Sequence, residues 1–190
     1  MTRIPLSIPD LRGNEERYLQ SCVRDNWVSS AGKFVTQLEE MVAERAGRRY
    51  GVATVNGTTA LQLALHALNV QPGDHVVVPD WTFAATANAV VHAGCVPLFV
   101  DVDPGCWSLS PAALDAALTG FRGGRIAAVI IVHPLGFPAD MDGLLAITRQ
   151  HGLPVVEDAA GALGASYHGR PVGGDADIAC FSFNGNKIVT

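Results

Sequence analysis

The sequence has few charged residues and no excess of positive charge. Asp, Glu, Lys and Arg make up 16% of its 190 residues, whereas about 25% is ordinary for a soluble domain. The formal net charge at pH 7 is -5, and no basic run is present. Nucleic acids and membrane surfaces are therefore not expected as partners. The apolar share of 48% suits buried parallel strands or a large subunit interface.

Long apolar runs and paired cysteines are also missing. No apolar stretch reaches the length of about 18 residues that a membrane span needs, and the N-terminal MTRIPLSIPD is too polar for a signal peptide. A cytoplasmic protein is expected. The cysteines form no C-x-x-C pair, and we expect free thiols and no metal site. These cysteines are Cys22, Cys95, Cys106 and Cys180.

Strands and helices alternate along most of the chain. The apolar pattern predicts strands at 50–55, 75–78, 96–100, 126–132, 154–156 and 177–183, and helices at 58–68, 82–92, 111–118 and 142–151. This alternation predicts an α/β fold in three layers, with a mostly parallel sheet covered by helices on both faces. Residues 1–32 are expected to form an extended arm, a short helix capped by Asn14 and a loop. One domain is expected over residues 33–190, beginning with a helix at 33–46.

Polar residues directly follow the first predicted strand in the sequence. In open α/β sheets, ligands bind at this carboxyl edge of the strands. Asn56, Gly57, Thr58 and Thr59 open the helix that follows this strand. The free N–H groups of a helix N-terminus suit a phosphate, and Gly57 would let the backbone approach it. Ordinary capping by Asn56 explains the same residues. The segment matches neither a Walker loop nor G-x-G-x-x-G.

Side chains of other kinds follow the later strands. Trp81 is interpreted either as an aromatic that stacks on a ligand ring or as a core residue. A carboxylate such as Asp158 caps a helix there or meets a ligand, for example the protonated nitrogen of a pyridine ring. Lys187 would become nucleophilic if buried, but a lysine near a chain end is ordinarily solvated. His133 is interpreted as a structural histidine at a strand end.

Six segments resemble, in order, motifs of the DegT/DnrJ/EryC1/StrS aminotransferases: 26–32, 56–61, 80–89, 136–141, 156–160 and 182–187. The resemblance implies the large domain of a fold-type I enzyme that uses pyridoxal 5'-phosphate (PLP). It also implies a homodimer with the active site at the subunit interface. Gly57, Thr58, Thr59 and Ser182 would then lie at the PLP phosphate. Trp81 would stack on the ring, Asp158 would pair with the ring nitrogen, and Lys187 would bind PLP covalently.

The resemblance also carries expectations about the reaction. Glutamate is the expected amino donor, and a nucleotide-linked keto-sugar, usually a 4-keto-6-deoxy sugar, is the expected acceptor, for aminosugars of surface polysaccharides. A branch of the family that dehydrates sugars carries histidine at the position of Lys187, so the lysine favours transamination. Gly161 stands where members often carry a glutamine near the 3-hydroxyl of PLP, so that role would pass to another group.

Family members are roughly twice as long as this chain. We therefore expect the chain to be truncated after the cofactor lysine, to lack the small C-terminal domain and the antiparallel strand that follows the lysine, and not to be a competent transaminase by itself. One alternative is a non-catalytic remnant that binds PLP or a partner subunit. Another is a different fold-type I enzyme, such as a cysteine desulfurase relative, which usually has histidine where this sequence has Asn186.

Overall fold

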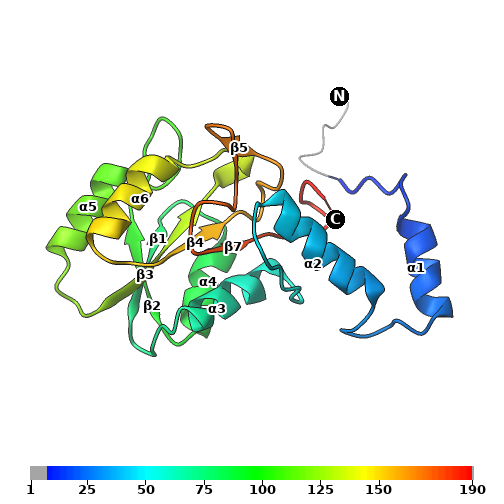
Figure 1. Ribbon diagram of the computed structural model, residues 1–190. Helices are drawn as coiled ribbons and strands as arrows, with labels where there is room; N and C mark the ends of the chain where they lie inside the picture. The colour runs from blue at the N-terminus through cyan, green and yellow to red at the C-terminus, as the bar shows by residue number, and fades with distance from the viewer. Residues whose placement is uncertain (1–7, 190) are drawn as a thin grey trace, which may run out of the picture.

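Five parallel strands form the central sheet of this protein, in the order β2-β1-β3-β4-β7. They are β1 (His75–Pro79), β2 (Val96–Val100), β3 (Ile126–Val132), β4 (Val155–Asp158) and β7 (Ile178–Cys180). The coordinates are a computed structural model that describes residues 8–189, so the predicted extended arm at 4–9 lies largely outside the described residues. The structure thus confirms the predicted α/β class and the parallel sheet (Figure 1).

Helices cover both faces of the sheet, which completes the three layers. On one face, α3 (Gly57–Ala67) and α4 (Ala84–His92) pack against each other and on the strands. On the other face lie α5 (Pro111–Gly120), which is capped by the Ser110 side chain, and α6 (Met141–Gln150). Alternate residues of β1 face opposite layers: Val76 and Val78 pack with the α3–α4 cluster and Val77 with the α5–α6 cluster.

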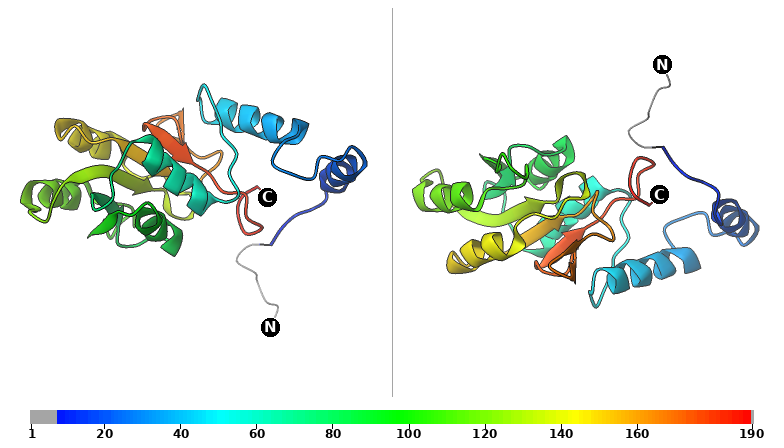
Figure 2. Two further views of the ribbon diagram at one scale, coloured as in Figure 1. Left: turned by 90° about the horizontal axis from the view of Figure 1, so that it is seen from below. Right: turned by 90° about the horizontal axis from the view of Figure 1, so that it is seen from above.

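The first two helices stand beside the sheet. Helix α1 (Glu15–Arg24) has no buried residue, and α2 (Lys33–Arg45) buries only Ala43. Figure 2 shows α1 far from the layered body, with α2 between them. Asn14 occupies the N-cap position of α1, but its side chain makes no capping hydrogen bond, so the predicted cap is wrong in that respect.

The strand predicted at 50–55 is absent from the structure. This segment pairs with no strand, and the exposed fractions of Tyr50, Val52 and Val55 are 72%, 72% and 84%. The N–H of Ala53 donates to Oε1 of Glu39 at 2.8 Å instead of to a neighbouring strand. A strand needs a hydrogen-bonded neighbour, and the described residues supply none beside this segment.

The last predicted strand is shorter than expected. It was placed at 177–183, but β7 ends at Cys180, which pairs with Asp158 at the end of β4. The three residues that follow have no partner strand because β4 has already ended. A short antiparallel pair, β5 (Ser166–Tyr167) with β6 (Arg170–Pro171), was not predicted.

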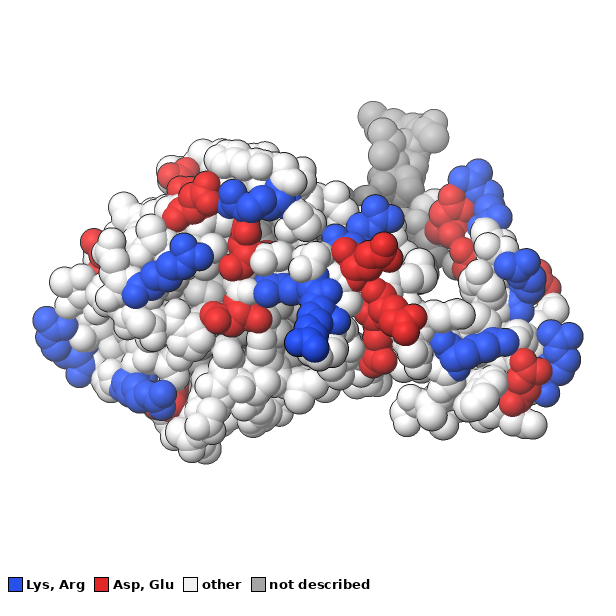
Figure 3. All heavy atoms as spheres, viewed as in Figure 1, with Lys and Arg blue, Asp and Glu red and all other residues white. Residues whose placement is uncertain are grey.

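Acidic and basic side chains are interspersed on the face of the molecule in Figure 3. Among the described residues, no helix is both long and apolar enough to cross a membrane.

Candidate active site at the carboxyl edge of the sheet

Asp158 lies at the carboxyl end of β4, between β3 and β7, with 6% of its surface exposed. Its Oδ2 accepts a hydrogen bond from the Thr86 hydroxyl at 2.7 Å, and its Oδ1 accepts one from the N–H of Ala160 at 3.2 Å. Burial raises the pKa of Asp158, and these hydrogen bonds and the charge of Lys187 oppose the rise. The sheet thus holds a buried carboxylate at the edge where ligands bind.

Thr86 is a part of this site that the sequence patterns did not reveal. It is fully buried in the first turn of α4, and its hydroxyl also lies 2.8 Å from the hydroxyl of Thr82. The spacing of four residues between two threonines at a helix start was the available signal, but nothing in it pointed to Asp158, which lies 72 positions away.

The N-terminus of α3 faces Ser182 across a very short gap. A Cβ built on Gly57 would lie 3.1 Å from the Ser182 Cβ and 3.4 Å from its Oγ, so only glycine fits without displacement. The N–H groups of Gly57 and Thr58, and the Thr58 hydroxyl, make no hydrogen bond within residues 8–189. Free donors at a helix N-terminus beside a serine hydroxyl are suited to an anion.

Asn56 caps α3, as the simpler interpretation of this segment proposed. Its Oδ1 accepts hydrogen bonds from the N–H of Thr59 at 2.9 Å and from the Thr59 hydroxyl at 3.1 Å. The Thr59 side chain is therefore engaged in the cap, which leaves Gly57, Thr58 and Ser182 as the free donors of the cradle.

Lys187 follows β7 in a turn in which its N–H donates to the Asn184 carbonyl at 2.7 Å. Its Nζ lies 5.7 Å from the centre of the Phe83 ring. Within residues 8–189 it makes no salt bridge, yet its charge acts on Asp158 and favours the ionised carboxylate. The fold therefore brings the lysine and the carboxylate, 29 positions apart in the sequence, to the same edge of the sheet.

Trp81 borders a neighbouring hollow. Its ring is 40% exposed and meets the Trp107 ring edge-to-face, with centroids 5.0 Å apart. The hollow is lined by Trp81, Gly105, Cys106, Trp107, Pro134, Leu135 and Phe137. Neither Asp158 nor Lys187 lines it, so a stacking role for Trp81 at the carboxylate stays a prediction.

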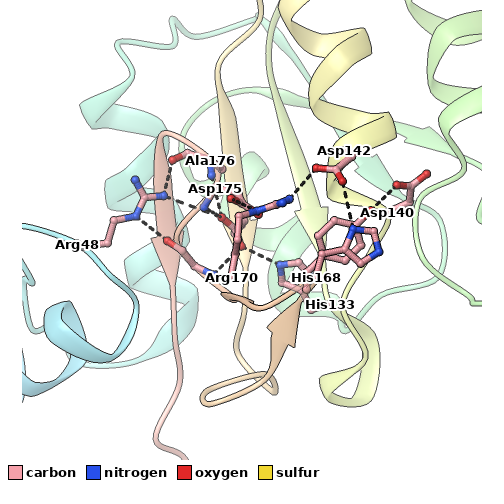
Figure 4. Close-up of polar contacts among 11 residues, drawn as sticks. Arg48, His133, Asp140, Asp142, His168, Arg170, Asp175 and Ala176 are labelled. Atoms are coloured by element: carbon pink, nitrogen blue, oxygen red, sulfur yellow. Dashed lines mark hydrogen bonds and ion pairs between the residues drawn. The ribbon is translucent and has the colours of Figure 1, made fainter.

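Glu157 belongs to a separate polar network, and Figure 4 labels its partners Arg48, His133 and Ala176. Its carboxylate accepts the Nε2–H of His133 at 3.0 Å and N–H groups of Gly173 at 2.7 Å and Ala176 at 2.9 Å. Burial alone would raise the pKa of Glu157, but these hydrogen bonds together lower it. His133 is also satisfied, since its Nδ1 accepts from Ala139 at 3.1 Å, which fits the structural role predicted for it.

Gly161 offers no side chain to this edge, as the sequence shows. A Cβ on the adjacent Gly136 would lie 2.9 Å from the Gly161 carbonyl oxygen, so these two backbones pack closely. The four cysteines are free; Cys95 and Cys180 are buried, and burial raises the pKa of the Cys180 thiol to about 12.

Comparison with known proteins identifies relatives of this chain. A model of the DegT/DnrJ/EryC1/StrS aminotransferase family matches residues 9–190. GDP-perosamine synthase of Caulobacter vibrioides is 44% identical over 190 residues, which are 100% of this chain and 50% of that protein. The UDP-N-acetyl-3-dehydro-alpha-D-glucosamine 3-aminotransferase of Acidithiobacillus ferrooxidans is 48% identical over 150 residues, 79% of this chain and 40% of that protein.

Solved structures agree with these relatives. The PLP-form of a putative sugar aminotransferase from Streptococcus pneumoniae superimposes with a TM-score of 0.90 at 27% identity, over 100% of this chain and 51% of that one. The chain thus spans about half the length of the proteins it matches. With a match over nearly all of its residues, it belongs to the DegT/DnrJ/EryC1/StrS aminotransferase family.

Proposed function

We propose that the protein is a PLP-dependent aminotransferase that acts on a nucleotide-linked keto-sugar as a cytoplasmic homodimer. The observation that carries the proposal is the buried carboxylate of Asp158 at the end of β4, under the influence of the Lys187 charge. Beside it lies the open helix N-terminus of Gly57, with Ser182 across the gap. A carboxylate, a lysine and an anion cradle are the groups that PLP requires.

The residues present fit this cofactor. The free N–H groups of Gly57 and Thr58 and the Ser182 hydroxyl would bind the phosphate oxygens, which are strong acceptors. Asp158 would accept a hydrogen bond from the protonated ring nitrogen, because each of its oxygens keeps a lone pair beyond the bonds from Thr86 and Ala160. We assign the ring face to Trp81. Thr59 would support the phosphate cradle through the cap that it makes with Asn56.

Bound PLP supplies an electron sink that stabilises negative charge on the substrate carbon next to nitrogen. Lys187 would hold the cofactor covalently through Nζ, and the same amine, once free, would move a proton to and from that carbon. Asp158 would keep the ring nitrogen protonated, because a nearby carboxylate stabilises the positive charge. The low exposure of Asp158 limits water around that pair.

The relatives support a nucleotide sugar as the substrate. Their names include a perosamine synthase and a 3-aminotransferase for a 3-dehydro sugar, so both act on nucleotide sugars. We propose glutamate as the amino donor and a 4-keto-6-deoxy sugar as the acceptor. In this proposal residues 1–32 form an arm, residues 33–190 belong to the large domain, and a small domain and a second subunit complete the sugar pocket.

Covalent capture of PLP tests the cofactor lysine. The chain contains two lysines, Lys187 and Lys33, and Lys33 lies on α2 with its Nζ 3.7 Å from Asp25. Incubation with PLP followed by borohydride reduction should label Lys187 alone in peptide mass spectra. The Lys33→Ala variant should be labelled as fully as the wild type. Labelling of Lys33, or of neither lysine, would contradict the proposal.

Turnover distinguishes an enzyme from a non-catalytic remnant. Protein that is loaded with PLP but not reduced, in a form that carries the small domain, should convert glutamate to 2-oxoglutarate when nucleotide-linked keto-sugars are supplied. These sugars are varied in the nucleotide and in the position of the keto group. Capture of PLP at Lys187 without any turnover would support the remnant instead.

Substitution of Gly57 tests the phosphate cradle. Gly57→Val should weaken PLP binding about tenfold, because the added side chain pushes Ser182 away and removes about one charge-assisted hydrogen bond. Gly120→Val is the matched control, since a Cβ there meets nothing within 4 Å. Absorbance titration with PLP measures both variants, and equal affinities would show that the cradle lies elsewhere.

A further inference from the structure

Two threonine hydroxyls in sequence form hydrogen bonds that lead to the Asp158 carboxylate. Its Oδ2 receives the Thr86 hydroxyl at 2.7 Å, and Thr86 is 0% exposed. The Thr86 hydroxyl has one proton to give. Because it donates to the carboxylate, the contact of 2.8 Å with Thr82 must be one in which Thr82 donates to Thr86. Two hydroxyls therefore point in one direction, toward Asp158.

The position of Thr86 in α4 makes this orientation rigid. A threonine in a helix commonly turns its hydroxyl to a backbone carbonyl of the preceding turn. Here the backbone N–H of Thr86 bonds to Phe83 at 3.0 Å, and the hydroxyl is directed to Asp158 instead. A β-branched side chain without exposure has few accessible rotamers, so the donor is preorganised before any ligand arrives.

Few other groups act on the carboxylate. The Ala160 N–H bonds to the other oxygen, and Lys187 acts on the carboxylate by charge alone. Thr86 is thus the one side chain with a hydrogen bond to Asp158 within residues 8–189. Burial disfavours a charged carboxylate, and a donated hydrogen bond favours it.

We propose that Thr86, supported by Thr82, is a positioning residue that holds the Asp158 carboxylate as the acceptor for a protonated ring nitrogen. This inference rests on the proposed function, since PLP is the ligand that brings such a nitrogen. Thr86 itself touches no reacting atom and acts through Asp158. Removal of its hydroxyl leaves the carboxylate with a backbone donor on Oδ1 and none on Oδ2.

Substitution of the hydroxyls tests the proposal. Thr86→Val keeps the shape and removes the donor, Thr86→Ser keeps the donor, and Thr82→Val removes the second hydroxyl. Thr148→Val is the matched control, because Thr148 is equally buried on α6 and its hydroxyl bonds to the Leu145 carbonyl at 3.2 Å. Each variant is measured by PLP titration and by the pH dependence of the ring-nitrogen 15N chemical shift of bound 15N-labelled PLP, with thermal unfolding as a check on folding.

Thr86→Val should bind PLP about tenfold more weakly, as expected for one lost hydrogen bond to a charged group. The ring nitrogen of its bound PLP should lose its proton at lower pH than in the wild type. Thr86→Ser should restore both properties, Thr82→Val should shift them less, and Thr148→Val should match the wild type. A Thr86→Val protein with the affinity and pH profile of Thr148→Val would overturn the inference while the proposed function stands. A wild-type protein that binds no PLP would overturn both. If Thr86→Val fails to fold, Thr82→Val becomes the deciding variant. An unchanged pH profile in Thr82→Val would overturn the proposal that the two hydroxyls position Asp158.

Discussion

In a protein that carries the small domain, replacement of Lys187 by alanine is expected to lower transamination at least about a thousandfold, because the variant loses both the covalent anchor of PLP and the proton-transfer amine. The protein should stay folded, since Lys187 makes no salt bridge within the described residues. Single-turnover absorbance changes with glutamate measure the effect, and PLP titration shows whether the cofactor still binds.

Lys187→Arg separates the charge of the lysine from its chemistry. Arginine keeps a positive charge near Asp158, but it stays protonated at any working pH and is not a nucleophile. The Arg variant should therefore bind PLP better than the Ala variant and be equally inactive. Lys33→Ala should retain wild-type turnover. If either Lys187 variant kept more than about a tenth of that turnover, Lys187 would not be the group that moves the proton.

The substitutions Asp158→Asn and Glu157→Gln are expected to change the stability of the cofactor-free protein in opposite directions. The two carboxylates are adjacent on β4 and both are buried, at 6% and 1% exposure. Burial raises the pKa of Asp158, whereas the donors around Glu157 lower its pKa. The same chemical change, carboxylate to amide, therefore removes an unfavourable buried charge at one site and a well-paired one at the other.

Asp158→Asn should raise the free energy of unfolding by about 1 kcal/mol, as is common when a functional group is removed at the expense of activity. The Thr86 hydroxyl can accept one N–H of the new amide and turn its own proton to the Thr82 hydroxyl. Glu157→Gln should lower the free energy of unfolding by about 3 kcal/mol, because its amide NH₂ replaces one oxygen. The NH₂ would then face either the donors of His133 and Gly173 or the N–H groups of Asp175 and Ala176. Urea unfolding at neutral pH measures both. The exposed Asp115→Asn is the control and should change stability by less than about 0.5 kcal/mol.

The pH dependence of stability follows from the same pKa directions. Glu157 contributes stability above its ordinary pKa, and this contribution is lost as the pH falls through the lowered pKa of the folded state. Asp158 has the opposite sign: the folded state loses stability as the pH rises from the ordinary pKa of the group to its raised value. Each amide variant should remove its own part of the profile. Two variants that shifted stability in the same direction at neutral pH would contradict the distinction between the sites.

Much of the layered fold could be predicted from the apolar pattern. The strand at 126–132 has the bounds of β3, because seven consecutive apolar residues are buried on both faces of a parallel sheet. The predictions failed where a strand needs a partner at the sheet edge. Residues 50–55 have the composition of a strand but no neighbour to pair with, and β7 ends where β4 ends. Amino-acid composition indicates the preference of a segment for a strand. Strand pairing depends on whether another backbone lies beside that segment.

The candidate site shows the same division. The sequence by itself determined the kinds of group at the strand ends, namely Asp158, Lys187, Ser182 and the Gly57 turn, since a parallel sheet carries such residues to one edge. Only the tertiary structure decided which of them meet. In the sequence Thr86 is an ordinary helix residue. The packing of α4 on the sheet places its hydroxyl 2.7 Å from Asp158. Glu157 and Asp158 are neighbours in sequence, but their side chains alternate to opposite faces of the strand. The hydrogen-bond donors around Glu157 lower its pKa, whereas burial raises the pKa of Asp158.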